Sequence, residues 1–322
     1  MELRATHRAM DTAFAVSIVV STEAEKEYAR SAAEAAFERI DALERLFTRF
    51  DDTSDVAVIR ALAPGEVAVV ARETMELLAI SAKVCAATRG AFDPTVGPVM
   101  DRLRASVPGG PAPRAAWERI DGETLADALA RGGMQRLVLD IENCRVSVTP
   151  DRLGRATPLE LDFGGIGKGY ALDACAELLK GEPFSCGAFL LDAGTSTVLA
   201  HGGTWKIGVG GTFKERTRRP TTVELSSGAL SGSGFDIQGQ HVVDVRRGGA
   251  AARWAAAWAR AESAAVADAL STAVLALSSG ELRAAADDLC AAVLVARDQA
   301  PALDRIRDPL VSFSSPKWAH LL

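Results

Sequence analysis

The sequence has few of the residues that build metal centres and disulfide frameworks. It contains four histidines and five cysteines in 322 residues, and the cysteines are widely separated, with no C-x-x-C pair. This spacing favours neither a zinc site nor a disulfide framework, and it is typical of proteins from a reducing compartment. We therefore expect a cytoplasmic protein without a histidine-rich metal centre.

Long hydrophobic runs are also missing. The longest near the N-terminus, Ala13–Val20, is too short to span a bilayer, so no membrane insertion is expected. Arg4 and Arg8 precede this run, as in a secretory signal, but no A-x-A cleavage site follows. The alternation of small and large residues favours a first β-strand instead. With the first cysteine at Cys85, no lipid anchor is expected near the N-terminus.

An excess of basic charge is absent too. The formal net charge is −6, which argues against a protein that binds the phosphate backbone of nucleic acid. A hydrophobic fraction of 48% with 24% charged residues is ordinary for a soluble globular protein. The length allows one large domain or two closely packed ones, and we expect a single domain over residues 1–322.

Apolar periodicity predicts helices and strands that do not follow a strict βαβ order. The predicted helices are Thr22–Phe47, a short one ending at Ile59, Glu73–Thr88, Lys168–Leu179, Ala261–Leu277 and Glu281–Val293. The predicted strands are Thr12–Val20, Leu137–Val148 with a turn at Asn143, Phe189–Ala200, Thr204–Gly210, Thr221–Leu225 and His241–Val245. Residues 94–113 are rich in proline and glycine and predict loops. This mixture predicts an α+β fold, with mixed or antiparallel sheets flanked by helices.

A glycine-rich segment, Leu161–Ala171, joins a predicted strand to a predicted helix. It has four glycines in the six positions 164–169, which lets backbone approach a ligand, and the helix N-terminus behind it favours anions. A Walker A loop would require Gly at Asp162 and Ser or Thr at Gly169, and a Rossmann fingerprint would require Gly or Ala at Tyr170. Both motifs are therefore excluded, and an unfamiliar phosphate loop or a plain strand-to-helix turn remains.

A late helix carries an acidic residue among apolar ones. Asp268 and Thr272 stand four residues apart, so their oxygens lie on one face. A cation such as Mg²⁺ would offset the cost of burying the carboxylate. Alternatively, Asp268 caps a helix and Thr272 hydrogen-bonds back to a carbonyl group. The sequence supports both interpretations equally.

Two further segments are candidates for chemistry. His241, in the stretch that runs to Arg246, is suited to act as a general base near neutral pH, although a lone histidine is more often structural. Phe92, in the loop Gly90–Pro98, is suited to stack on an aromatic ring system, and a structural turn with a packed Phe is equally consistent.

These four segments, in this order, resemble the ApbE-type FAD:protein FMN transferases. Asp162–Ala171 is similar to the family's glycine-rich aspartate motif, and Phe92–Pro98 to its FD-x-TVGP loop. Ala267–Ala273 looks like its metal-binding helix, and His241–Asp244 resembles its HIID segment. The resemblance is strongest over residues 10–277, and it implies a smaller lobe that closes an FAD cleft.

The resemblance also implies roles for individual residues. FAD, as the substrate, would contact Met10, Phe50, Ala91, Phe92, Asp93, Asp162, Lys168 and Val242. Mg²⁺ would be held by Asp268, Ser271, Thr272 and the main-chain oxygen of Gly165, and His241 would be the general base. The implied reaction moves FMN from FAD to a Thr or Ser hydroxyl of an acceptor flavoprotein and releases AMP.

The chain departs from the family pattern in places, and alternatives remain. Leu191–Ser196 replaces the usual N-L-G-G-D segment, and Val245 stands where Pro commonly follows HIID. The same Mg-FAD site with water as nucleophile would make an FAD pyrophosphatase that yields FMN and AMP. A non-catalytic FAD-binding protein is a third possibility.

Overall fold

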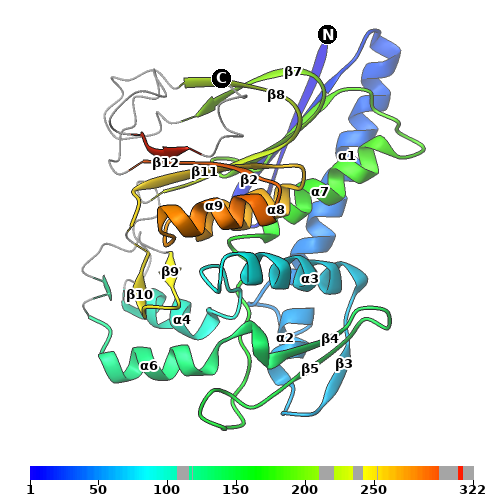
Figure 1. The fold of residues 1–322 in the computed structure, drawn as a ribbon. Coiled ribbons are helices and arrows are strands. Elements are labelled where there is room, and N and C mark those ends of the chain that lie inside the picture. The colour runs from blue at the N-terminus through cyan, green and yellow to red at the C-terminus, as the bar shows by residue number, and fades with distance from the viewer. Residues whose placement is uncertain are drawn as a thin grey trace.

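An antiparallel eight-stranded sheet forms the larger half of the molecule (Figure 1). The structure is a computed structural model that describes residues 1–106, 116–117, 119–209, 221–234, 242–251, 253–296 and 311–314. The strands, in sheet order, are β1 (Glu2–Ala9), β2 (Thr12–Val19), β6 (Phe189–Asp192), β7 (Thr197–Val209), β8 (Thr221–Gly234), β11 (Ala256–Ala261), β12 (Ala292–Ala296) and β13 (Val311–Ser314). The N-terminal and C-terminal strands therefore lie at opposite edges of one sheet.

Helices cover one face of this sheet. They are α1 (Glu23–Phe47), α7 (Gly167–Lys180), α8 (Ala264–Ala273) and α9 (Ser279–Asp288), with α3 (Arg72–Ala87) beyond them. Helix α8 contacts β7, β8 and β11 on one side and α3 and α7 on others. It is buried nearly all round, so its polar side chains must find partners inside the protein.

The smaller half contains a three-stranded sheet and short helices (Figure 1). The sheet order is β3 (Val67–Val69), β5 (Arg145–Val148) and β4 (Leu137–Asp140). The helices are α2 (Asp55–Ala61), α4 (Gly97–Ser106), α6 (Gly122–Arg131) and the 3₁₀ turn Met134–Arg136. A two-stranded hairpin, β9 (Val243–Asp244) and β10 (Gly249–Ala250), lies beside α4 and α6 in Figure 1.

Side-chain caps begin several of the helices. Thr22, Ser54 and Ser263 accept hydrogen bonds from the first-turn amides of α1, α2 and α8. Ser278 and Glu281 form a complete capping box at the start of α9. These polar residues satisfy amide groups that would otherwise lack intrahelical partners, which is why the helices begin at these positions.

The predicted α+β class is confirmed, and several of the predicted strands have other bounds in the structure. The predicted strand Phe189–Ala200 is interrupted at residues 193–196, where β6 turns into β7. The predicted strands Phe189–Ala200 and Thr204–Gly210 are not separate at this point, because β7 continues through Gly202 and Gly203, which have positive φ and lie at a shift in its register with β8. Glycine absorbs the irregularity without ending the strand.

The late helices are shorter than predicted. Ala261 belongs to β11, and α8 ends at Ala273. Ala292 and Val293 belong to β12, since α9 ends at Asp288. The loop-rich region also contains α4. Among the described residues, no helix is long and apolar enough to span a membrane.

Candidate active site

Three segments far apart in sequence meet at Gly165. A Cβ built on Gly165 would lie 3.4 Å from Thr272 Oγ1 and 3.6 Å from Phe92 Cε2. The glycine-rich segment, the late helix α8 and the Phe92 loop therefore form one site. A side chain at position 165 would fill the space between them.

Asp268 is buried at the centre of a hydrogen-bond network. It is 2% exposed. Its Oδ2 accepts a hydrogen bond from Gly169 N at 3.0 Å. Its Oδ1 accepts from the hydroxyls of Ser196 and Thr197, each at 3.1 Å, and of Ser231 at 3.4 Å. Donors from α7, the β6–β7 turn, β7 and β8 thus compensate for the loss of water around this carboxylate.

Ser271 and Thr272 extend the network along α8. Ser271 Oγ lies 2.8 Å from Ser233 Oγ and 3.1 Å from Ser231 Oγ. Thr272 Oγ1 lies 3.4 Å from Ser233 Oγ and donates to the carbonyl of Asp268 at 3.3 Å. The back-bonding geometry expected for Thr272 is therefore present, and the threonine oxygen faces Gly165 at the same time.

Helices α7 and α8 cap each other. Asp268 of α8 accepts from Gly169 N in the first turn of α7. Asp173 of α7 accepts from Ala264 N and Ala265 N in the first turn of α8, at 2.7 and 2.9 Å. A Cβ on Gly169 would collide with the carbonyl of Ala264, so glycine is required for this close approach. Each carboxylate also interacts favourably with the positive, N-terminal end of the helix that it caps.

The polar groups around Asp268 fit a hard cation. Over the described ranges, no cluster of three or more His, Cys, Asp or Glu residues is positioned for a metal ion. The candidate ligands are the Asp268 carboxylate and the hydroxyls of Ser271 and Thr272, and Thr272 Oγ1 lies 3.4 Å from a Cβ built on Gly165. Magnesium binds through few protein oxygens and keeps water or phosphate ligands, so this donor set suits it.

Asp162 lies between two arginines and the glycine-rich loop. Its Oδ2 pairs with Arg49 Nη1 at 3.2 Å and Arg104 Nη2 at 3.0 Å, while its Oδ1 accepts from Gly164 N at 2.9 Å. Phe50, 77% exposed, has both guanidinium groups near its ring, at 6.0 and 5.7 Å from the centroid. These contacts hold an exposed aromatic face beside charged groups.

Asp93 ties its own loop together. Its Oδ1 accepts from Thr95 N at 2.9 Å and Thr95 Oγ1 at 2.6 Å, and its Oδ2 accepts from Met134 N at 3.2 Å. Burial raises the pKa of the Asp93 carboxyl, and these hydrogen bonds oppose the shift. The side chain thus fixes the loop, whatever it contacts in a ligand complex.

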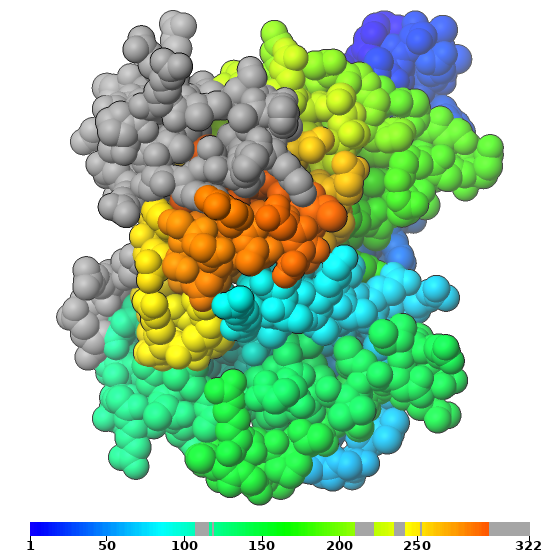
Figure 2. Space-filling model, in the orientation of Figure 1, coloured from blue at the N-terminus to red at the C-terminus, as the bar shows by residue number. Residues whose placement is uncertain are grey.

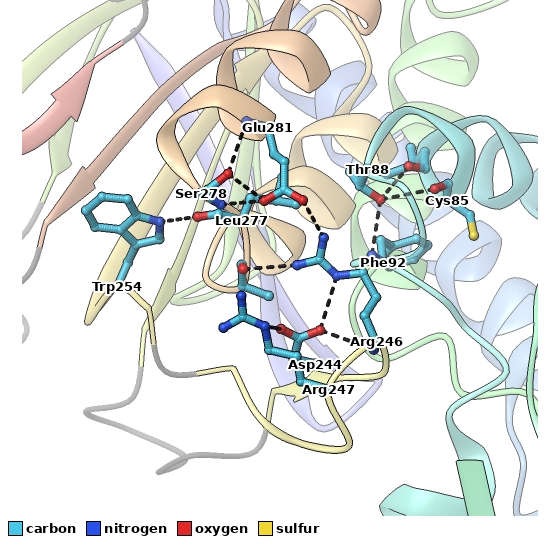
Figure 3. Close-up of polar contacts among 12 residues, drawn as sticks. Cys85, Thr88, Phe92, Asp244, Arg246, Arg247, Trp254, Leu277, Ser278 and Glu281 are labelled. Carbon is cyan, nitrogen blue, oxygen red and sulfur yellow. Dashed lines mark hydrogen bonds and ion pairs between the residues drawn. The ribbon is translucent and has the colours of Figure 1, made fainter. Parts of the chain in front are cut away.

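Phe92 and Ala91 are buried, each 5% exposed, in the main core. Thr88, at the end of α3, accepts from Phe92 N at 3.1 Å and donates to Val84 O at 2.7 Å (Figure 3). Packing therefore fixes the Phe92 ring, and the edge of the ring faces Gly165. This agrees with the alternative in which Phe92 is the packed residue of a structural turn.

Lys168 and Met10 occupy defined positions at turns. Lys168 Nζ donates to Gly164 O at 2.7 Å across the glycine-rich loop. Met10, with a φ of 48°, sits in the tight β1–β2 turn, and its amide donates to Glu44 Oε1 at 2.7 Å. Lys168 is thus held within its own loop, and Met10 is held against helix α1.

Val242 is buried, and its carbonyl accepts from Ala251 N at 2.8 Å. His241, the predicted general base, lies outside the described residues. Sequence patterns missed several polar groups of the site, namely Arg49, Arg104, Thr197, Ser231 and Ser233. The alternation of serines with other residues in β8 was an available signal, because Ser231 and Ser233 point to one face of a strand.

Known proteins resemble this chain in sequence and fold over most of its length. The model of a family described as the ApbE family matches residues 10–294. An FAD:protein FMN transferase of Klebsiella pneumoniae (strain 342) is 24% identical over 260 residues, 75% of this chain and 68% of that protein. The crystal structure of the ApbE protein of Thermotoga maritima has a TM-score of 0.77 at 24% identity, covering 100% of this chain and 99% of that one. The flavin transferase ApbE of Vibrio cholerae has a TM-score of 0.79 at 17% identity, with coverage of 100% and 99%.

Proposed function

The chain belongs to the ApbE family, and from that membership we propose that it is an FAD:protein FMN transferase. The acceptor would be a Thr or Ser hydroxyl of another protein. The observation that carries this proposal is the meeting of Gly165, Thr272 and Phe92 around the buried carboxylate network. That arrangement places a glycine-rich loop, suited to phosphates, against oxygens suited to a cation.

We assign the cation site to Asp268, Ser271, Thr272 and the carbonyl of Gly165. Magnesium, when bound there, would supply positive charge next to the pyrophosphate of FAD and to the departing AMP. Asp268 is the only one of these four groups that carries negative charge. Its hydrogen bonds to Gly169, Ser196 and Thr197 hold it in place before any ligand arrives.

FAD would lie along the glycine-rich segment, between the Asp268 network and the group formed by Asp162, its two arginines and Phe50. Lys168 and the backbone at Gly165 suit its phosphates, because they lie at the N-terminal end of α7, where the amide of Gly169 already donates to Asp268. The exposed ring of Phe50, beside Asp162 and its arginines, suits a flat ring system. Met10, Ala91, Phe92, Asp93 and Val242 complete the proposed FAD contacts.

The proposed chemistry is a displacement at phosphorus. His241 takes the proton of the acceptor hydroxyl, and the oxygen then bonds to the phosphorus of the FMN half. The bond from that phosphorus to the bridging oxygen breaks, and AMP leaves with the electron pair. The backbone at Gly165 and the ammonium group of Lys168 stabilise the charge on the phosphate oxygens.

The test is to mix the protein with FAD, Mg²⁺ and a candidate acceptor protein, and to measure the intact mass of the acceptor. Transfer adds one FMN to the acceptor, and a Thr→Val or Ser→Ala change at the target abolishes the addition. Release of free FMN and AMP with an unmodified acceptor would indicate the pyrophosphatase. Binding of FAD without any product would indicate a non-catalytic protein.

A further inference from the structure

Arg246 joins the β9–β10 hairpin to the chain that follows α8. Its Nε lies 3.2 Å from Asp244 Oδ1, its Nη1 lies 2.9 Å from Glu281 Oε1, and its Nη2 donates to Ala276 O at 3.1 Å (Figure 3). One guanidinium thus contacts three places: its own hairpin, the start of α9 and the chain between α8 and α9. A planar fork with five donors suits such a junction better than an ammonium group does.

These ion pairs are shielded from solvent. The exposed fractions of the side chains are 4% for Asp244, 22% for Arg246 and 28% for Glu281. Asp244 also accepts a hydrogen bond from Arg246 N, at 3.2 Å, so this carboxylate binds both the main chain and the side chain of Arg246. Charge pairs with limited exposure and several hydrogen bonds are stronger than surface pairs, and removing one partner is costly.

Arg247, the next residue, provides a contrast in the same hairpin. Its side chain is 65% exposed, and its Nε lies 3.8 Å from Asp244 Oδ2. The two neighbours carry the same charge and share the same acidic partner. They differ in that Arg246 reaches Glu281 and Ala276 and lies closer to Asp244, so a comparison of the two tests the junction contacts as a group.

Neighbouring residues fasten the same chain. Trp254 Nε1 donates to Leu277 O at 2.7 Å, and Arg253 N donates to Leu275 O at 3.2 Å. The successive carbonyls of residues 275–277 therefore all accept hydrogen bonds from the segment that contains Arg246 and Trp254. The positive charge of Arg246 also interacts favourably with the negative, C-terminal end of α8. In Figure 2 this segment, in yellow, runs from the sheet half along the orange α9 to the half that contains α4 and α6.

We propose that Arg246 is a positioning residue, which holds the β9–β10 hairpin, and with it Val242, in register with the cation-binding face of α8. The role rests on the proposed function, because it concerns how two parts of that site are aligned. Val242 enters the hairpin and bonds to Ala251, and His241 directly precedes it in sequence. Asp268 and Thr272 lie on α8, and Arg246 contacts Ala276 in the chain that directly follows this helix. A hairpin that shifts relative to α8 would misalign the base and the cation.

The experiment compares Arg246→Gln, Arg246→Lys and Arg247→Gln by three measurements. They are the exchange rate of the hairpin amides Gly248 and Ala251, the affinity for FAD with Mg²⁺, and kcat for FMN transfer at saturating FAD. We expect Arg246→Gln to exchange faster and to lower kcat about 10- to 100-fold, as a small misplacement of reacting groups does. Its FAD affinity should change much less than kcat. Arg246→Lys should recover part of kcat, and Arg247→Gln should match the wild type.

Equal kcat values for Arg246→Gln and Arg247→Gln would overturn the proposal, and so would unchanged amide exchange in Arg246→Gln. Should Arg246→Gln fail to fold, Glu281→Gln is the second variant. It removes the charged partner of Arg246 on α9, while Gln retains the capping box. We expect the same faster amide exchange and lower kcat, with smaller effects. A wild type that transfers no FMN would refute the proposed function instead. In that case the amide exchange still decides whether Arg246 fastens the hairpin.

Discussion

Asp268 is the residue on which the proposed cation site depends most. Asp268→Asn keeps the size of the side chain and one acceptor oxygen for the hydroxyls of Ser196 and Thr197, but it removes the negative charge. We expect this variant to fold and to lose magnesium-dependent turnover. Calorimetric titration of Mg²⁺ in the presence of FAD measures the loss of magnesium binding, and an FMN-transfer assay measures the loss of turnover. Asp287→Asn, which removes a charge from an exposed position on α9, is the matched control.

Asp268→Ala is a harsher change at the same position. It leaves the amide of Gly169 and buried hydroxyls without their acceptor, at a cost of about 1–3 kcal/mol for each unsatisfied group. We expect lower stability as well as no metal-dependent turnover. Full activity in either variant would contradict the assignment.

His241 is predicted to act on rate rather than on binding. His241→Ala should slow FMN transfer by about 10²–10⁴-fold, the usual contribution of a general base. FAD affinity should change far less, because the phosphates and the ring system have other proposed partners. Single-turnover kinetics with a separate FAD titration distinguishes the two effects. Equal losses of rate and affinity would make His241 a binding residue.

At the scale of elements, the contact between α7 and α8 is sensitive to one methyl group. Gly169→Ala would place a Cβ against the carbonyl of Ala264, where the backbones of two helices meet. Overpacking of this kind costs about 1–3 kcal/mol, and it would also push Asp268 away from α7. Urea unfolding should report the loss in stability.

Gly280→Ala is the control for that measurement. Gly280 lies in α9, and a Cβ there meets nothing within 4 Å. A glycine-to-alanine change in a compatible conformation is expected to be neutral or to stabilise by up to about 1 kcal/mol. Similar destabilisation in both variants would show that the α7–α8 approach is not the cause.

Elements with strong local signals were predictable from sequence. Helix α1 has a regular apolar stripe and a Thr22 cap, and α2 follows directly on its Ser54 cap. The strand β11, Ala256–Ala261, was not predicted, and its last residue, Ala261, was placed in the following helix. Alanine favours helices, and every residue of β11 but one is buried, so no alternation marks the strand. Pairing with β8 and β12 overrides this preference, and no local pattern records that pairing.

The site was predictable as segments and not as a network. Asp268 and Thr272 were found because an acid and a hydroxyl four residues apart stand out in an apolar helix. Arg104 and Ser231 reach the site only through tertiary packing, from α4 and β8. Residues that converge from separate elements leave no spacing in the sequence, so the arginine pairs and the hydroxyl network needed the structure.

At the scale of the whole molecule, the Arg246 junction links the two halves and should affect stability in acid. Hydrogen bonds from Ser278, together with Arg246, lower the pKa of Glu281 from 4.5 to about 2. Since the carboxyl has a lower pKa when folded, its contribution is fully present above about pH 4.5. It is lost as the pH falls toward 2.

Removing the titratable carboxyl of Glu281 should therefore reduce the pH dependence of the unfolding free energy in acid. In Glu281→Gln the unfolding free energy should be lower than that of the wild type at pH 7, by on the order of 1–3 kcal/mol, and the difference should shrink between pH 4.5 and 2. Urea unfolding at a series of pH values measures the difference, and Asp287→Asn on the exposed side of α9 supplies the baseline. A difference that stays constant over this range would mean that Glu281 titrates normally and that the junction carries no stabilising charge.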